Sequence, residues 1–217
     1  MKAKITRRDI FTKYMVVEFQ AQDPAFTFQA GEYIQLVLPN GLKHYFSITS
    51  SPNECPIFRI ATRPSETEYK KTLLELPIGT EVEINGPWGD LFLPEDKEDH
   101  FYCFIAGGIG ITPFISMIKY KVEESLSCEI NLVYFADPEP IFKMDLENLA
   151  DRSPKVRVLF VHERVSPEVI KSKLLDNYMD ATFMVAGAPE FVNSAVAALS
   201  ALGIPQRQII FESYTGY

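Results

Sequence analysis

A glycine-rich turn between two apolar segments constrains this chain more than any other feature of its sequence. Residues 107–113 read Gly-Gly-Ile-Gly-Ile-Thr-Pro, after an apolar run over 101–105 and before a helix-like pattern over 114–122. Glycine tolerates positive φ and close backbone approach, and a helix N-terminus presents unpaired N–H groups to anions. We therefore expect strand, turn and helix, with Thr112 as N-cap and Pro113 as the first helical residue. A phosphate-bearing ligand would bind there, although a tight turn without a ligand has the same pattern.

Composition narrows the class of protein. A chain of 217 residues and 24.6 kDa is long enough for two modest domains. Its 21 basic and 29 acidic residues give a formal charge of −8, which argues against nucleic acid or an anionic membrane as partner. Cys55, Cys103 and Cys128 suit neither a disulfide framework nor a metal site. With no membrane-length apolar run, we expect no membrane span, no bound metal and a soluble, cytoplasmic protein.

The first part of the chain, residues 1–97, has the pattern of a small antiparallel barrel. Short alternating segments occur over 14–20, 33–38, 45–49, 57–62 and 81–84, separated by turn signals such as Pro39-Asn40-Gly41 and Gly86-Pro87. One interruption, residues 67–76, has helical spacing and either Ser65 or Thr67 as its cap. We expect a six-stranded antiparallel β-barrel with one helix.

Residues 98–217 follow a different rhythm, after the charged break over 94–100. Strands are expected near 101–106, 129–135, 156–161, 181–186 and 208–212, with helices near 113–123, 142–150, 166–175 and 189–202. This α/β alternation predicts a doubly wound parallel sheet that binds a nucleotide beyond the carboxyl ends of its strands. Gly107-Gly108, Asp137 and Gly187-Ala188-Pro189 each follow a strand, so these three loops should converge.

Several motifs, in order, resemble those of the ferredoxin–NADP reductase-like family. They are Phe28-x-x-Gly31-Glu32-Tyr33, His44-Tyr45-Phe46-Ser47, Gly86-Pro87-Trp88-Gly89, the turn at 107–113, Ala186-Gly187-Ala188-Pro189 and Glu212-Ser213-Tyr214. The resemblance covers nearly the whole chain. It implies a barrel that holds FAD, a second domain that binds NADH or NADPH, and hydride transfer between the two cofactors.

On the flavin side, the resemblance assigns the cofactor to His44, Tyr45, Phe46 and Ser47, with Thr62, Thr67 and Lys70. His44 stands where the family has arginine. Because a neutral imidazole binds an anion less well than guanidinium does, we expect a weakly held or exchangeable flavin. The expected compensation comes from Lys43, from the amide groups that open the helix near Thr67, and from Lys70 or Lys71 within that helix.

On the nicotinamide side, the resemblance assigns the cofactor to Gly107, Gly108, Gly110, Thr112, Ala186, Gly187 and Pro189. Ala186 replaces the family's cysteine, which predicts altered rather than lost transfer. Ser47, Thr112, Glu212 and Tyr214 are the expected catalytic residues, and either Tyr214 or Tyr217 would cover the flavin. Asp137 can accept hydrogen bonds from a ribose diol and repels a 2′-phosphate, so NADH is preferred; Arg164 could reverse this.

Three functions remain open from the sequence. The first is a flavoprotein reductase that passes electrons to a separate acceptor, either a carrier protein or a small molecule. The second is a flavin or ferric reductase with exchangeable flavin, which His44 favours. The third is a non-catalytic redox-sensing or assembly subunit, suggested by His44 and Ala186.

Overall fold

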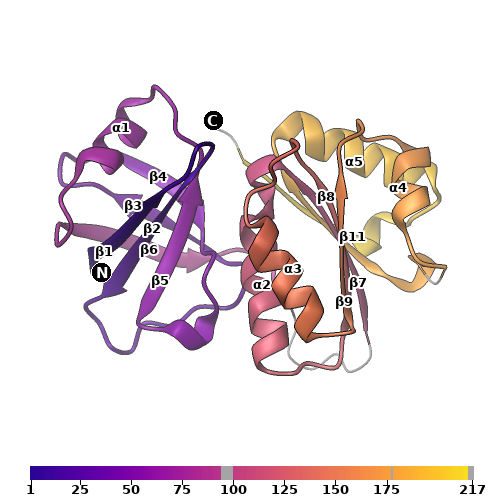
Figure 1. Ribbon diagram of the computed structural model, residues 1–217, viewed down its shortest axis with the longest axis horizontal. Coiled ribbons are helices and arrows are strands. Elements are labelled where there is room, and N and C mark those ends of the chain that lie inside the picture. The colour runs from indigo at the N-terminus through magenta and orange to yellow at the C-terminus, as the bar shows by residue number, and fades with distance from the viewer. Residues whose placement is uncertain (94–99, 177, 215–217) are drawn as a thin grey trace.

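The computed structural model describes residues 1–93, 100–176 and 178–214, which form two bodies packed side by side (Figure 1). The first is an antiparallel sheet that curls into a barrel. The second is a parallel sheet with helices on both faces. The expected boundary at residues 97 and 98 lies outside the described residues and stays a prediction.

The first body confirms the predicted six-stranded antiparallel barrel. Its strands are β1 (Lys2–Ile10), β2 (Met15–Ala21), β3 (Tyr33–Val37), β4 (Lys43–Ser47), β5 (Ile57–Thr62) and β6 (Glu81–Trp88), in the order β4-β3-β6-β1-β2-β5. A single antiparallel bridge between Ile48 and Ile60 joins the two edges and closes the barrel. The helix α1 (Glu68–Glu75) begins one residue after Thr67, as the spacing predicted.

Two features of the barrel differ from the sequence interpretation. The sequence interpretation did not include strand β1. Buried and exposed side chains alternate only in its first half, where Ala3 and Ile5 are buried, and no side chain after Ile5 in this strand is fully buried. Gly86-Pro87, expected as a turn, lies within β6. Strand β6 can contain these residues because the β3–β6 ladder is irregular between Tyr33 and Gln35, opposite this end of the strand.

The second body confirms the predicted α/β alternation. Its strands β7 (Phe101–Gly107), β8 (Glu129–Phe135), β9 (Val156–Val161), β10 (Thr182–Gly187) and β11 (Ile209–Ser213) are all parallel, in the order β11-β10-β7-β8-β9. Helices α2 (Ile111–Glu123) and α3 (Lys143–Arg152) pack on one face, while α4 (Pro167–Lys173) and α5 (Pro189–Ala201) pack on the other. The strand order reverses beside β7, which places a ligand crevice at its carboxyl end.

The predicted start of α2 is wrong. A 3₁₀ turn over Gly108–Gly110 runs directly into the helix, so Gly110 rather than Thr112 occupies the N-cap. Thr112 lies inside the first turn, where its hydroxyl donates to the Ile109 carbonyl at 2.9 Å. The glycines allow the helix to begin two residues earlier than the capping preference of threonine suggested.

Helix α2 also forms the seam between the two bodies (Figure 1). The Ser116 hydroxyl donates to the Ser50 carbonyl at 2.6 Å, and the Lys119 amine donates to the Thr49 carbonyl at 3.1 Å. Gly31 of the barrel is so close to the helix that an added Cβ would lie 2.3 Å from the Met117 methyl carbon. The barrel and the helix therefore meet in close contact along the flank of α2.

A search of the described ranges finds no helix long and apolar enough to cross a membrane. Within those same ranges, no cluster of three or more histidine, cysteine or carboxylate side chains could hold a metal ion.

Substituting Gly31 tests whether the seam needs this close approach. A Cβ there would also lie 2.1 Å from the Leu91 carbonyl oxygen, and the residue has φ +109°. We expect Gly31→Ala to lower the free energy of unfolding by about 3 kcal/mol, through overpacking and backbone strain together. Urea denaturation followed by circular dichroism measures the change.

Gly41 is the matched control, because it has φ +85° but nothing within 4 Å of an added Cβ. Gly41→Ala should cost only about 1 kcal/mol, the strain of a left-handed backbone. Equal losses in the two variants would show that the seam tolerates a wider separation.

Candidate functional site

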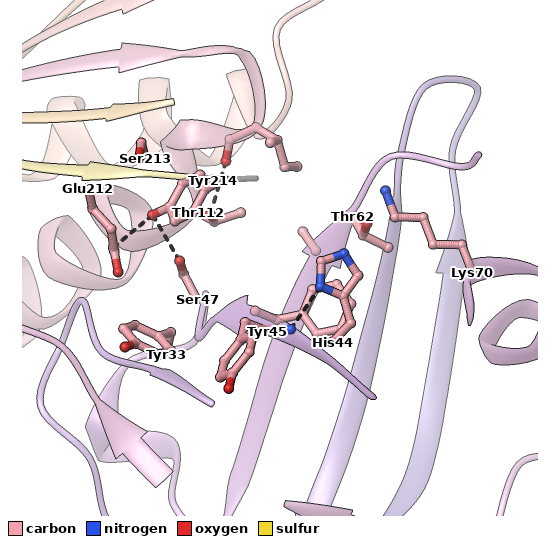
Figure 2. Close-up of a pocket in the computed structure, with 13 residues that line it drawn as sticks. Tyr33, His44, Tyr45, Ser47, Thr62, Lys70, Thr112, Glu212, Ser213 and Tyr214 are labelled. Atoms are coloured by element: carbon pink, nitrogen blue, oxygen red, sulfur yellow. Dashed lines mark hydrogen bonds between the residues drawn. The ribbon is translucent and has the colours of Figure 1, made fainter. Parts of the chain in front are cut away.

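A pocket of about 260 Å³ opens where the barrel meets the carboxyl edge of the parallel sheet (Figure 2). Both bodies contribute its walls. The barrel and α1 supply Tyr33, His44, Tyr45, Phe46, Ser47, Ala61, Thr62 and Lys70, and the second body supplies Ile109, Thr112, Glu212, Ser213 and Tyr214. The pocket therefore exists only because the two bodies are held together.

A chain of hydrogen bonds crosses this junction. The Ser47 hydroxyl donates to the Tyr214 hydroxyl at 3.0 Å, which in turn donates to a Glu212 carboxylate oxygen at 3.1 Å (Figure 2). The Tyr214 backbone N–H donates to the Gly187 carbonyl at 2.9 Å, so the residue is fixed just beyond β11. Burial raises the pKa of Glu212, while the Tyr214 hydrogen bond opposes that rise.

The barrel wall of the pocket is largely aromatic. His44 and Phe46 share one face of β4, with ring centroids 4.9 Å apart, and both pack against the Tyr69 ring of α1. The Tyr45 backbone N–H donates to His44 Nδ1 at 2.8 Å. This bond and the contact with the Tyr69 ring fix the orientation of the imidazole at the pocket wall.

Lys70 supplies a cation at the same wall. Its residue is only 3% exposed, although it lines the pocket. Burial, and then the nearby Arg63 guanidinium, lower the pKa of its amine. The two cations repel each other, and a bound anion would offset this repulsion. Phosphate oxygens are anions of this kind.

The glycine turn forms the edge of the second body beside the pocket. Gly108 alone of its three glycines has positive φ, +55°, and its carbonyl accepts a 2.9 Å bond from the Tyr134 hydroxyl. At Gly110 an added Cβ would lie 2.1 Å from the Ala186 carbonyl oxygen, so this glycine allows α2 to approach the end of β10. Two of the predicted loops therefore touch, as their positions in sequence required.

Arg63 is the functional candidate that sequence reasoning missed. It follows β5, and its Nη2 would lie 3.0 Å from a Cβ added to Gly108. The same guanidinium lies 3.9 Å from the Asp137 carboxylate, so the barrel, the glycine turn and the loop after β8 meet at this side chain. The sequence offered one indication of a role for Arg63, its position directly after a predicted strand. Its proximity to Asp137 arises only from the packing of the two bodies.

The structure brings together most, but not all, of the predicted residues. His44, Tyr45, Phe46, Ser47, Thr62, Lys70, Thr112, Glu212 and Tyr214 line the pocket. Gly107, Gly108, Gly110, Asp137, Ala186, Gly187 and Pro189 lie at the adjoining edge of the sheet and do not line it. Thr67 is exposed at the start of α1, and Tyr217 lies outside the described residues. Tyr33, Ala61, Ile109 and Ser213 line the pocket without having been predicted.

Comparison with known proteins agrees with this geometry. Residues 104–197 match the family model described as the oxidoreductase NAD-binding domain. Ferredoxin–NADP reductase B of Sorangium cellulosum is 30% identical over 154 residues, which are 68% of this chain and 63% of that protein. The propane 2-monooxygenase reductase component of Rhodococcus jostii is 24% identical, over 99% of this chain and 64% of that protein. The chain thus spans just under two thirds of the length of these two relatives.

The fold as a whole also has solved counterparts. The crystal structure of flavohemoglobin from Malassezia yamatoensis, with bound FAD and heme, superimposes with a TM-score of 0.81. It is 21% identical and matches 99% of this chain and 60% of that one. With a barrel, a parallel nucleotide-binding sheet and a shared pocket between them, the chain belongs to the ferredoxin–NADP reductase-like family of FAD- and NAD(P)-binding oxidoreductases.

Proposed function

We propose that this protein transfers a hydride from NADH to FAD and passes the electrons to a separate acceptor. The observation that carries the proposal is the pocket in which Ser47 of the barrel meets Tyr214 and Glu212 of the nucleotide domain. Hydride transfer needs two rings aligned in a site from which water is excluded. A pocket built from both domains meets that need.

The residues present fit a flavin. Phe46 offers an apolar, polarizable wall, Ser47 a hydroxyl on the next strand position, and Lys70 with Arg63 a cationic region suited to the pyrophosphate. When bound, FAD would supply the hydride-accepting ring. The chain itself would orient that ring, donate a hydrogen bond from Ser47 and keep bulk water away.

Tyr214 would cover the face of the flavin that the nicotinamide has to occupy. Its hydroxyl bonds to both Ser47 and Glu212, so entry of the nicotinamide requires these bonds to rearrange. Burial raises the pKa of Glu212 and so favours its protonated form. This carboxyl is therefore suited to holding a proton at the end of the hydrogen-bond chain from Ser47 through Tyr214.

The loop after β8 favours NADH. The Asp137 carboxylate is more than half exposed and would accept hydrogen bonds from a ribose diol, whereas a 2′-phosphate would be repelled. Its ion pair with Arg63 is long, at 3.9 Å, so the carboxylate oxygens remain accessible to a ribose diol.

The second candidate is a flavin reductase from which the flavin itself exchanges. His44 in place of the family's arginine favours it, because imidazole binds an anion less well than guanidinium does and the pocket then depends on Lys70 for much of its charge. The similarity to a monooxygenase reductase component favours instead a protein acceptor for the electrons. Turnover that rises saturably with added free flavin would favour exchange.

Removing the Ser47 hydroxyl tests the proposed transfer site. We expect Ser47→Ala to slow reduction of bound FAD by NADH on the order of 100-fold, since one preorganised donor at the reacting ring is lost. Anaerobic stopped-flow absorbance measures the rate. Ser194→Ala is the control, because that exposed hydroxyl on α5 donates only to the Glu190 carbonyl, and it should retain the parent rate. An unchanged rate in Ser47→Ala would remove Ser47 from the mechanism.

Neutralising Asp137 tests the nucleotide preference. Asp137→Asn should lower the ratio of kcat/KM for NADH over NADPH about tenfold, or roughly 1.4 kcal/mol, by removing the charge that repels the 2′-phosphate. Glu139→Gln is the matched control in the same loop, where the carboxylate pairs with Lys13 at 3.8 Å. A parent enzyme that uses NADPH better than NADH, or a ratio that both variants change equally, would contradict the assignment.

A further inference from the structure

Three aromatic side chains gather at the outer rim of the pocket. Tyr33, Tyr45 and Trp88 come from the adjacent strands β3, β4 and β6, and we call them the rim cluster. Their ring centroids lie 5.9 Å (Tyr33–Tyr45), 6.2 Å (Tyr33–Trp88) and 6.5 Å (Tyr45–Trp88) apart, with the planes tilted by 51° to 77°. Tyr33 and Tyr45 meet edge to face, while the Trp88 ring is tilted relative to both, and Tyr45 and Trp88 remain exposed to solvent.

The exposure of this cluster needs an explanation. Tyr45 is 55% exposed and Trp88, the single tryptophan of the chain, is 44% exposed. One exposed aromatic residue is ordinary, but adjoining exposed rings are typical of a binding surface. The barrel core packs on the opposite side of the sheet and does not depend on these side chains.

The rim cluster is continuous with the proposed redox site. Tyr33 and Tyr45 line the same pocket as Ser47 and Glu212, and Figure 2 shows both tyrosines next to Ser47. A molecule stacked on the cluster would therefore lie at the open edge of the ring that Ser47 orients. Electron transfer to such a molecule would need no rearrangement of the barrel.

Charge selects among the planar molecules that could stack there. Burial raises the pKa of Tyr33, and the carboxylates of Glu212 and Asp90 raise it further. Asp90 likewise contributes to the raised pKa of Glu212. The charge of Asp90 therefore acts on the pocket side of the rim, where it would repel phosphate-bearing acceptors such as free FMN but not an uncharged ring.

We propose that the rim cluster is a stacking site for an uncharged, planar electron acceptor of the quinone class. This inference rests on the proposed function, because NADH is the source of the electrons. The quinone takes up a hydride equivalent that originates in NADH and one proton from solvent. It becomes the hydroquinone as NADH becomes NAD⁺, and the protein-bound cofactor is unchanged over the cycle.

Trp88 makes binding directly measurable, since all tryptophan fluorescence of the chain comes from the cluster. Titration of FAD-loaded protein with 2-methyl-1,4-naphthoquinone should quench this fluorescence saturably, without shortening the excited-state lifetime. Collisional quenching equal to that of free tryptophan amide would overturn the site. If the quenching is saturable but NADH does not reduce the bound FAD, the stacking site is supported and only the proposed function is contradicted.

A variant then tests the role in turnover. Trp88→Ala should raise the KM for the naphthoquinone about tenfold by removing one stacking partner. Turnover with ferricyanide, a small anion that does not stack, should remain at the parent level. Trp88→Phe should recover most of the naphthoquinone KM, and Phe11→Ala, at an exposed ring on the β1–β2 hairpin, should leave it unaltered. An unaltered KM for the naphthoquinone in Trp88→Ala would contradict the proposal. The same holds if this variant impairs only electron transfer to a carrier protein.

Discussion

The contact between helix α2 and the barrel is the constraint on which the rest of the structure depends. One helix has its N-terminus at the glycine turn and its flank against the barrel through Gly31, Ser116 and Lys119. Since both Ser50 and Ser116 are fully buried, breaking their 2.6 Å bond would leave a polar group without a partner. The orientation of the two bodies is therefore fixed as part of the core. Only in that orientation do Ser47 and Tyr214 come within 3.0 Å.

Electrostatics divides the pocket into regions with different ligand preferences. Lys70 and Arg63 make one side cationic, while Asp90 places a carboxylate near the rim. His44 packs against Phe46 and Tyr69 on the same wall, and its Nδ1 accepts a bond from the Tyr45 backbone N–H. A dinucleotide with its phosphates at the cationic side and its reacting ring at Ser47 suits this distribution, and an uncharged acceptor suits the rim.

Local patterns were enough to predict most of the fold. Each strand of the parallel sheet is an apolar run, and each helix between them has a break or cap that marks its start, so the predicted and observed boundaries differ by about two residues. Strand β1 lacks full alternation, and the start of α2 is set by glycine packing against Ala186 rather than by a capping side chain. Both deviations have tertiary causes that local sequence does not contain.

The site, like the fold, could be predicted from local sequence only in part, because some of its residues are brought together by tertiary packing. His44, Phe46, Ser47, Glu212 and Tyr214 lie in short motifs, so resemblance to a family located them. Arg63 and Tyr33 act through neighbours more than 50 residues away, Asp137 and Glu212, and their importance emerges only when the two bodies pack. The motifs thus identify each half of the pocket, and packing determines which residues complete it.

The most direct test of the central claim is the visible absorbance of FAD-loaded protein before and after anaerobic addition of NADH. If the shared pocket is a hydride-transfer site, the oxidised-flavin bands should disappear on mixing and return when an acceptor is added. Bound FAD whose spectrum is unaltered by NADH and by NADPH would contradict the claim.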